Sequence, residues 1–456
     1  MQLCFRTTLL TTLLLPAAVL ASGGPDPLVL QLRSEASEAM HWVGSPRAAA
    51  HLIRLHAMRD QVSDLQLLAQ VYNDVLSHPS ADPETRALAR TLLADIERAR
   101  GLLTKAAELL EPLGYVSQYY LLGGFDNEGK GGCSRDFGPE GSLDLKATYA
   151  GKGHPASWRK LSVRSYDGYV DLATAIRPNH EAVAYALTFL QAPRETLASL
   201  SLGASGAFRI WVNGELVALE DRYNRARPDQ ARVAVRLRKG VNRVLLKVCQ
   251  NNGPFGFYFR QERGPGSAAR ATPVLPDALP PLEQGPRPAP KLLPTLSSLL
   301  EQEVKKHPND AHLRGEYATV LSYVRAFDES EHRDTTQANA AASSAPKDVA
   351  LQLLAAELQE DEPNLRRKHL EAALEAAPDY PFTRLLLAQH ELTHGYPERA
   401  LAGAKPLIRE FPGFAAPRLV ELHAYDALGS GLAWSTWSSA CFGIFRTCRK
   451  WHAKRR

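Results

Sequence analysis

Hydrophobic and polar positions divide this chain into a helical part, a strand-rich part and a second helical part. Between residues 46 and 113 apolar residues recur every three or four positions, as at Leu52, Leu55 and Met58. This is the spacing of one buried helix face. The pattern predicts three or four short antiparallel helices there, a β domain over 115–262, and a longer helical domain over 296–428.

The middle region has about 145 residues and many turn signals. Asn213-Gly214 and Lys239-Gly240 each separate two apolar or alternating runs, so each predicts a β-hairpin. Eight or more short strands without a helical pattern predict a β-sandwich. The other expected strands cover residues 115–125, 142–149, 158–163, 168–176, 182–191, 196–203 and 255–260.

A proline-rich stretch follows the predicted sandwich. Residues 264–295 contain nine of the 31 prolines of the chain. Proline has no backbone N–H and a fixed φ, so it interrupts both sheets and helices. We therefore expect a semi-extended linker that joins neither a sheet nor a helix and marks a domain boundary.

The second helical part contains a repeat. Four prolines, each expected to open a pair of helices, are separated by 38, 32 and 34 residues: Pro308, Pro346, Pro378 and Pro412. This spacing resembles tetratricopeptide repeats, and Ala388, Gly395 and Ala400 match that family in the last unit. The resemblance implies an α-solenoid whose concave side binds a protein or peptide. The helices of 46–113 are interpreted as a degenerate part of the same array.

The middle region resembles the galactose-binding-like jelly-roll modules attached to many secreted bacterial enzymes. The resemblance rests on segments 123–128, 167–172, 184–187, 206–215 and 237–248, together with Trp158. It implies a jelly-roll fold, and some relatives bind carbohydrate on loops at one end. The side chains suited to such a site would be the aromatic Trp158, Tyr166, Trp211 and Tyr223, with the polar Asn213 and Arg222.

A structural explanation of the same residues is favoured over a sugar site. Trp211 is expected to lie in the core and Asn213 to form the turn. Asp126, Asn127 and Glu128 could bind calcium, as in some relatives, but a polar turn with these residues needs no metal. No cofactor is otherwise indicated.

The segment His390-Glu-Leu-Thr-His394 matches the zinc-protease pattern His-Glu-x-x-His. On a helix two such histidines face the same way, and the glutamate could act as a general base. Gly395 ends the helix directly after the second histidine, and no third ligand follows at a known spacing. The repeat register explains the segment, so a zinc protease is a remote alternative.

Charge is distributed unevenly along the chain. The formal net charge is +5, but Arg6 and the tail 429–456 carry seven positive charges, which leaves about −2 elsewhere. Binding of nucleic acid by the body of the protein is therefore not indicated. The tail also contains Trp434, Trp437 and Trp451, a composition suited to a membrane surface. A solvated or disordered end is the favoured interpretation.

Residues 1–21 have the pattern of a secretory signal, with Arg6 before an apolar run of about twelve residues. Export to the periplasm, cell envelope or exterior is expected, and disulfides can form there. Cys133 could pair with Cys249, and Cys441 with Cys448. Unpaired buried thiols are an equal alternative for the first two.

These features predict an exported, non-catalytic binding or scaffold protein. The repeats would hold a protein partner, and the sandwich would bind carbohydrate or serve as structural support. An alternative is the accessory part of an exported hydrolase or of a transglutaminase-like enzyme whose catalytic domain is elsewhere. No catalytic residues are assigned.

Overall fold

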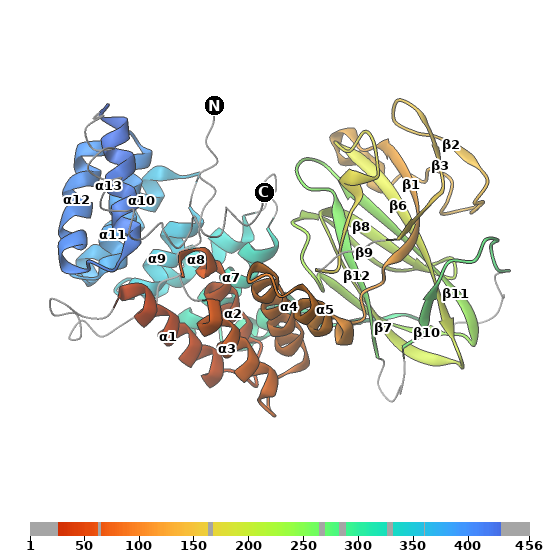
Figure 1. Cartoon of the computed structure of the whole chain (residues 1–456), viewed down its shortest axis with the longest axis horizontal. Helices are drawn as coiled ribbons and strands as arrows, with labels where there is room; N and C mark the ends of the chain where they lie inside the picture. Colours follow the sequence, from red (N-terminus) through yellow and green to blue (C-terminus); the bar gives the residue numbers. More distant parts are fainter. Residues whose placement is uncertain are drawn as a thin grey trace.

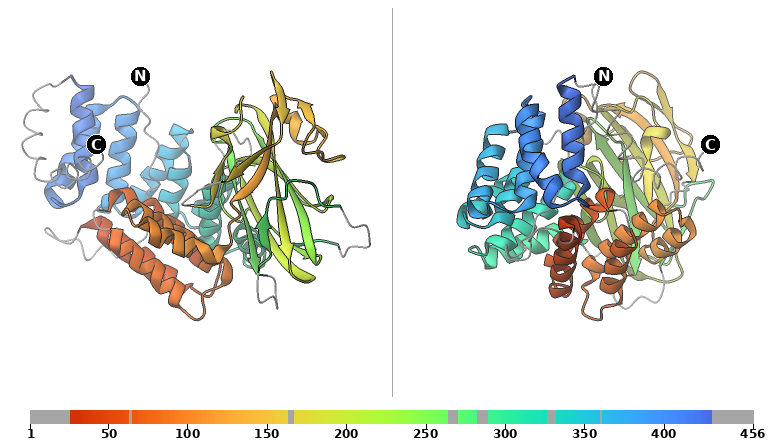
Figure 2. Two further views of the ribbon diagram at one scale, coloured as in Figure 1. Left: turned by 45° about the vertical axis from the view of Figure 1, so that its right-hand side comes forward. Right: turned by 60° about the vertical axis from the view of Figure 1, so that its left-hand side comes forward.

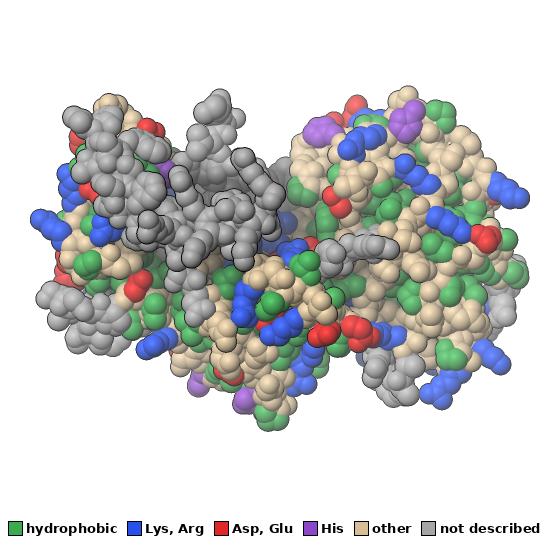
Figure 3. Space-filling model, viewed as in Figure 1, with side chains coloured by type: hydrophobic (Ala, Val, Ile, Leu, Met, Phe, Trp, Pro, Cys, Tyr) green, Lys and Arg blue, Asp and Glu red, His purple; other side chains and the backbone are tan. Residues whose placement is uncertain are grey.

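Along the chain a two-sheet sandwich lies between two helical regions. In space the helices from both ends lie together on one side and the sandwich lies on the other (Figure 1, and the same view with side chains in Figure 3). The computed structural model describes residues 26–62, 65–162, 167–263, 270–281, 289–325, 332–359 and 361–429. The expected leader, Tyr166, most of the aromatic and basic tail, and the pair Cys441 and Cys448 lie outside these residues. In the described part no helix is long and apolar enough to cross a membrane.

The N-terminal helical region starts earlier than the apolar pattern indicated. Helix α1 begins directly after Asp26, whose side chain accepts a hydrogen bond from the Leu28 N–H and so caps the helix. The region comprises α1 (Pro27–His41), α2 (Arg47–Ala57), η2 (Arg59–Gln61), α3 (Leu65–Ser77), α4 (Pro83–Ala99), α5 (Leu103–Leu110) and η3 (Glu111–Leu113).

The sandwich consists of two antiparallel sheets. One has the strand order β4-β1-β6-β11-β8-β9, with β13 also paired to β6, and the other has the order β14-β10-β7-β12-β5. The long strands are β1 (Gln118–Asp126), β6 (Ala182–Ala192), β7 (Thr196–Ala204), β8 (Gly206–Val212), β9 (Glu215–Asn224), β10 (Ala231–Leu237), β11 (Gly240–Gln250) and β12 (Gly256–Arg263). The short elements are η4 (Glu128–Cys133), β2 (Thr148–Ala150), β3 (Pro155–Ser157), β4 (Arg159–Ser162), β5 (Tyr169–Asp171), η5 (Leu172–Thr174), β13 (Thr272–Val274) and β14 (Lys291–Leu293).

Both faces of the central strands β1, β6, β11 and β8 of the larger sheet are largely buried. On β8, Phe208 and Ile210 point into the core between the sheets, whereas Trp211 points to the opposite face. That outer face carries a second apolar cluster, to which Tyr185 and Leu245 also belong. The segments after β1 and after β12 pack on it. Successive side chains of β8 therefore alternate between two buried faces of the sheet.

Three sequence predictions about the strands need correction. Asn213 and Gly214 form the expected hairpin, with φ of 51° and 86°. The first correction concerns Lys239-Gly240, which does not form a hairpin. Strands β10 and β11 belong to different sheets, and this turn crosses between them. The proline-rich stretch is not a pure linker, since β13 pairs with β6 and β14 with β10. Residues 142–147 are not a strand.

The C-terminal helices follow the proline spacing. Each of the four prolines lies between two helices, and Gly395, with φ of 82°, connects the two helices of the last unit. The helices are α6 (Leu296–Lys306), α7 (Ala311–Val324), α8 (Arg333–Ser344), α9 (Val349–Leu358), α10 (Pro363–Ala376), α11 (Pro381–Thr393), α12 (Pro397–Glu410) and α13 (Ala415–Ala427). Close packing of small residues, such as Ala388 of α11 against Gly403 of α12, joins neighbouring helices.

Helices from the two ends of the chain share one core. A single apolar cluster contains Leu52 of α2 and Tyr317 of α7, and α2 packs directly against α7. Figure 2 shows the N-terminal helices beside the first C-terminal ones. Arg47 and His51 of α2 reach Glu316 of α7 across this contact. We call this combined set of helices the helical array.

The sandwich is attached to the helical array by backbone and side-chain contacts. The N–H of Arg225, just after β9, donates to the carbonyl of Val324 at the end of α7, at 2.8 Å. Arg227 donates through Nε to the carbonyl of Tyr323 and stacks on its ring. Arg232 of β10 pairs with Glu84 of α4. The sandwich therefore contacts helices from both ends of the chain.

Candidate functional site

Two of the aromatic residues proposed to stack on a sugar lie in the outer-face cluster of the larger sheet. The Trp211 side chain belongs to this cluster and is only 8% exposed. Trp158 is partly buried against the same cluster. Neither residue presents an open ring face of the kind on which a sugar stacks. The structural explanation of Trp211 accounts for its position.

Tyr223 lies at one end of the sandwich. Its hydroxyl accepts a hydrogen bond from the Asn127 side chain, which also donates to the carbonyl of Gln250. Tyr223 also lines a hollow of about 210 Å³ with Asn224 and Asn252. Gln250 lines the same hollow, and its buried Oε1 has no hydrogen-bond partner among the described residues.

Asn213 is a turn residue whose side chain is fully engaged. Its amide donates to Asn242 Oδ1 at 2.9 Å, and its own Oδ1 accepts from the N–H of Arg243 at 2.8 Å. These bonds tie the β8–β9 hairpin to the start of β11. The positive φ explains why asparagine suits this position.

The residues considered for calcium have other partners. The Lys152 ammonium lies 3.0 Å from Asp126 and 3.3 Å from Glu128, where a cation would otherwise sit. Asn127 is buried, and its Oδ1 accepts from the Gly132 N–H. In the described part of the chain no group of three or more His, Cys, Asp and Glu side chains could hold a metal ion.

The His390 and His394 pair is part of the packing of α11. Their ring centroids are 4.1 Å apart, and His394 Nδ1 donates to the backbone carbonyl of His390. Burial and the neighbouring His394 lower the pKa of His390 to about 4. Glu391 forms ion pairs with Arg367 and Arg399. The carboxylate expected to serve as general base is therefore held by two guanidinium groups.

A disulfide joins Cys133 of η4 to Cys249 of β11, which settles the alternative left open for these two residues. Two positions earlier on the same face, Lys247 is completely buried. Its ammonium contacts Glu140 at 2.7 Å, and the Tyr185 hydroxyl donates to the same carboxylate at 2.6 Å. Burial lowers the pKa of Lys247, although the hydrogen bond and the charge of Glu140 act to raise it. The disulfide and the contacts of Glu140 hold the segment between β1 and β2 on the outer face of the sheet. We call it the covering segment.

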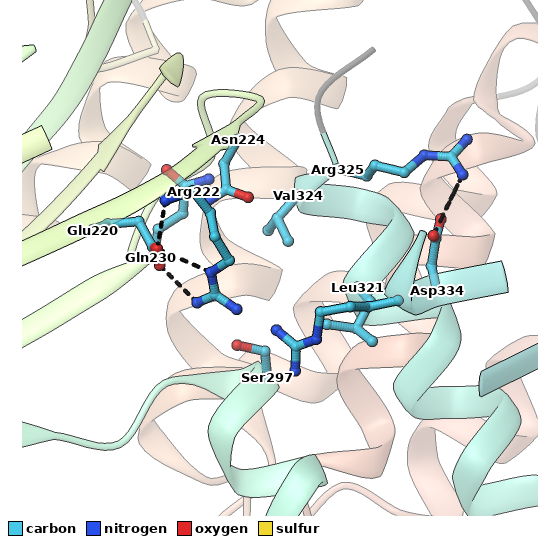
Figure 4. Close-up of a pocket in the computed structure, with 10 residues that line it drawn as sticks. Glu220, Arg222, Asn224, Gln230, Ser297, Leu321, Val324, Arg325 and Asp334 are labelled. Carbon is cyan, nitrogen blue, oxygen red and sulfur yellow. Dashed lines mark hydrogen bonds and ion pairs between the residues drawn. The ribbon is translucent and has the colours of Figure 1, made fainter. Parts of the chain in front are cut away.

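Arg222 lies in a different setting, at the junction between sandwich and helical array. It lines a cavity of about 50 Å³ together with residues from α6, α7 and α8 (Figure 4). We call it the junction cavity. Its walls are formed by Glu220, Arg222, Asn224, Gln230, Ser297, Leu321, Val324, Arg325, Arg333 and Asp334.

The junction cavity contains three guanidinium groups and two carboxylates among its described lining residues. Arg222 makes two side-chain hydrogen bonds to Glu220, at 2.9 and 2.7 Å. Arg325 pairs with the buried Asp334 at 3.1 Å. Arg333 donates to the Tyr317 hydroxyl, and burial raises the pKa of that phenol, so it stays neutral.

The sequence indicated only Arg222 of this cavity, and for another role. No signal in the sequence singled out Arg325 or Arg333. The convergence of β9 with α6–α8 depends on tertiary contacts between residues about 100 positions apart, such as Arg227 and Tyr323. No periodicity in the sequence encodes that contact.

Comparisons of the sequence with protein-family models and with curated proteins give no match. The resemblances to galactose-binding-like modules and to tetratricopeptide repeats therefore remain predictions. The observed architecture, with helices at both ends and antiparallel sheets between them, is broadly compatible with both.

Proposed function

We propose that this chain is an exported, non-catalytic binding or scaffold protein whose helical array takes a protein or peptide partner. The supporting observation is the shared core of α2 and α7, which makes one array from helices at both ends of the chain. Stacked helix pairs present an extended surface that suits peptides and proteins. The sandwich supports the array through the contacts at α4 and α7.

Export is supported by two independent features. The first 21 residues have the pattern of a cleavable leader. The Cys133–Cys249 disulfide forms stably in an oxidising compartment such as the periplasm or the exterior. Cells that express the chain can be fractionated into cytoplasm, envelope and medium. We expect the oxidised chain in the envelope or in the medium.

Selection from a random peptide library against the full chain tests the binding role. We expect enriched peptides, and we expect them to slow amide hydrogen exchange in α7–α13. Protection confined to the sandwich would contradict a role for the array. A library that yields no enriched peptide, together with no protein captured by crosslinking in the envelope, would reject the proposal.

A second candidate function is carbohydrate binding by the sandwich. It is favoured by the hollow at Tyr223, which has amide side chains around it and the unpartnered Gln250 Oε1. A glycan array probed with the full chain and with Asn252→Ala tests it, with Arg236→Gln on an exposed part of β10 as control. Binding that Asn252→Ala leaves unchanged would exclude this hollow.

A further inference from the structure

The junction cavity carries one positive charge that no carboxylate in its described lining offsets. Glu220 is matched by Arg222, and Asp334 by Arg325. The third guanidinium, Arg333, bonds only to the neutral Tyr317 hydroxyl among the described residues. A guanidinium has five N–H donors, so most of the donors of Arg333 remain for another acceptor.

Two helices begin at this cavity. Ser297 lies in the first turn of α6 and Arg333 is the first residue of α8, and both line the cavity. Helix N-termini carry a partial positive charge and favour anions. The N-cap of α8, His332, makes no capping hydrogen bond through its side chain. The C-terminal end of α7, with Leu321 and Val324, also lines the cavity, and its partial negative charge opposes these two ends. The positive charge of the site therefore comes from Arg333.

The size and charge of the cavity select among anions. About 50 Å³ has room for roughly three or four water molecules, which matches a carboxylate with its first methylene group. A single unmatched guanidinium suits a singly charged, planar carboxylate, which it can bind through two parallel hydrogen bonds. A doubly charged phosphate would leave one negative charge without a partner.

We propose that the junction cavity binds a carboxylate of the protein partner, an Asp or Glu side chain or a C-terminus, through Arg333. This inference rests on the proposed function, because it specifies the chemistry of the peptide that the array takes. It also assigns the sandwich a role in binding, since Arg222 and Asn224 complete the cavity from β9. The partner would then contact both parts of the protein.

The test repeats the peptide selection with full-length variants. Wild type should enrich peptides with one acidic position, and Arg333→Met should lose that preference and bind the selected peptides roughly tenfold or more weakly, as expected for a charge-assisted hydrogen bond. Arg333→Lys keeps the charge without the planar fork and should retain part of the affinity. Arg314→Met is the matched control. Within the described part of the chain Arg314 also bonds only to neutral groups, Gln337 and the Pro308 carbonyl, and it lies outside the cavity.

The outcomes separate this inference from the proposed function. Enriched peptides without an acidic preference, or with a preference that Arg333→Met leaves intact, would overturn the carboxylate site and leave the binding role standing. Competition by inorganic phosphate but not by acetate would overturn the choice of a carboxylate. An acidic preference seen only after Asp328, Glu329 and Glu331 are changed to amides would overturn the partner as the source of the carboxylate, because the chain would then supply its own. Absence of any enriched peptide, together with no protein captured by crosslinking in the envelope, would reject both proposals.

Discussion

Arg47 of α2 binds Glu316 of α7 through two hydrogen bonds of 2.6 and 3.0 Å, although the residues are 269 positions apart. The Glu316 side chain is only 5% exposed, so water does not compete for the carboxylate. The pair connects helices that the sandwich separates in the sequence. It lies within the shared core of the helical array.

Replacing Arg47 with Met should strongly destabilise the helical array. Breaking a buried ion pair leaves an uncompensated charge and typically costs about 3–5 kcal/mol. Urea unfolding followed by helical circular dichroism should show this loss. The double variant Arg47→Met/Glu316→Met should recover part of it, because Glu316 is then no longer buried without Arg47, while Asp310 and His51 still lose one partner each.

The control for this prediction is Lys305→Met, which removes an exposed pair with Glu301 on α6. Exposed pairs contribute little, so its unfolding curve should overlay that of wild type. Equal losses for Arg47→Met and Lys305→Met would show that the buried pair has no special role in joining α2 to α7.

The contribution of His51 to stability should fall as the pH rises. Burial and Arg54 act to lower its pKa, but hydrogen bonds with Glu316 and Glu35 outweigh them and raise the pKa above the ordinary value of 6.5. A raised pKa means that the folded state favours the protonated form. The stabilisation is therefore complete below about pH 6.5 and is lost as the pH rises through the raised value.

Unfolding free energies of wild type and His51→Gln between pH 5.5 and 9 measure this contribution. The difference between the two proteins should shrink toward high pH. His56 and His390 have lowered pKa values and the opposite pH dependence, but both are present in each protein and cancel in the difference. A difference that is constant across this range would contradict the charged His51.

Loss of the Cys133–Cys249 disulfide should destabilise the sandwich selectively. The bond links residues 116 positions apart, and a loop of that length corresponds to about 3–5 kcal/mol in the chain-entropy description. Hydrogen exchange of Cys133→Ser/Cys249→Ser should speed up in β6 and β11. Exchange in α9–α13 serves as the internal control, and uniform acceleration there would argue against a local effect.

Trp211→Ala should lower the unfolding free energy of the sandwich by about 3–5 kcal/mol, the range for removing a large buried side chain. Leu219→Ala on β9 is the control, since Leu219 is 48% exposed. A stacking residue in an open sugar site could be removed at little cost. Wild-type stability for Trp211→Ala would therefore favour the sugar site over the core position.

Much of the fold could be predicted from local patterns. The helix period, the Asn213-Gly214 turn and the four spaced prolines located elements correctly, because each acts over a few residues. The Lys239-Gly240 turn misled, since the same local chemistry can close a hairpin or connect two sheets. Only the pairing of β10 with β7 and of β11 with β6 decides between them.

The candidate site could be predicted far less well. Aromatic residues such as Trp211 were visible in the sequence, but their burial depends on the covering segment held by Lys247 and the disulfide. Arg333 gave no signal in the sequence, because its importance comes from the lack of a paired carboxylate in the described lining of the cavity. A side chain is recognised as unmatched only when its neighbours are known.

The shared core of α2 and α7 has a consequence for the order of folding. During synthesis α1–α5 are complete before the sandwich, and the side chains of α2 that contact α7 lack that partner until α7 follows. Helix α2 therefore completes its packing only when α7, made much later, is present. Contacts this distant in sequence form slowly. A chain interrupted within the sandwich would expose the side of α2 that packs on α7, so protection of that side until α7 is made should depend on other proteins.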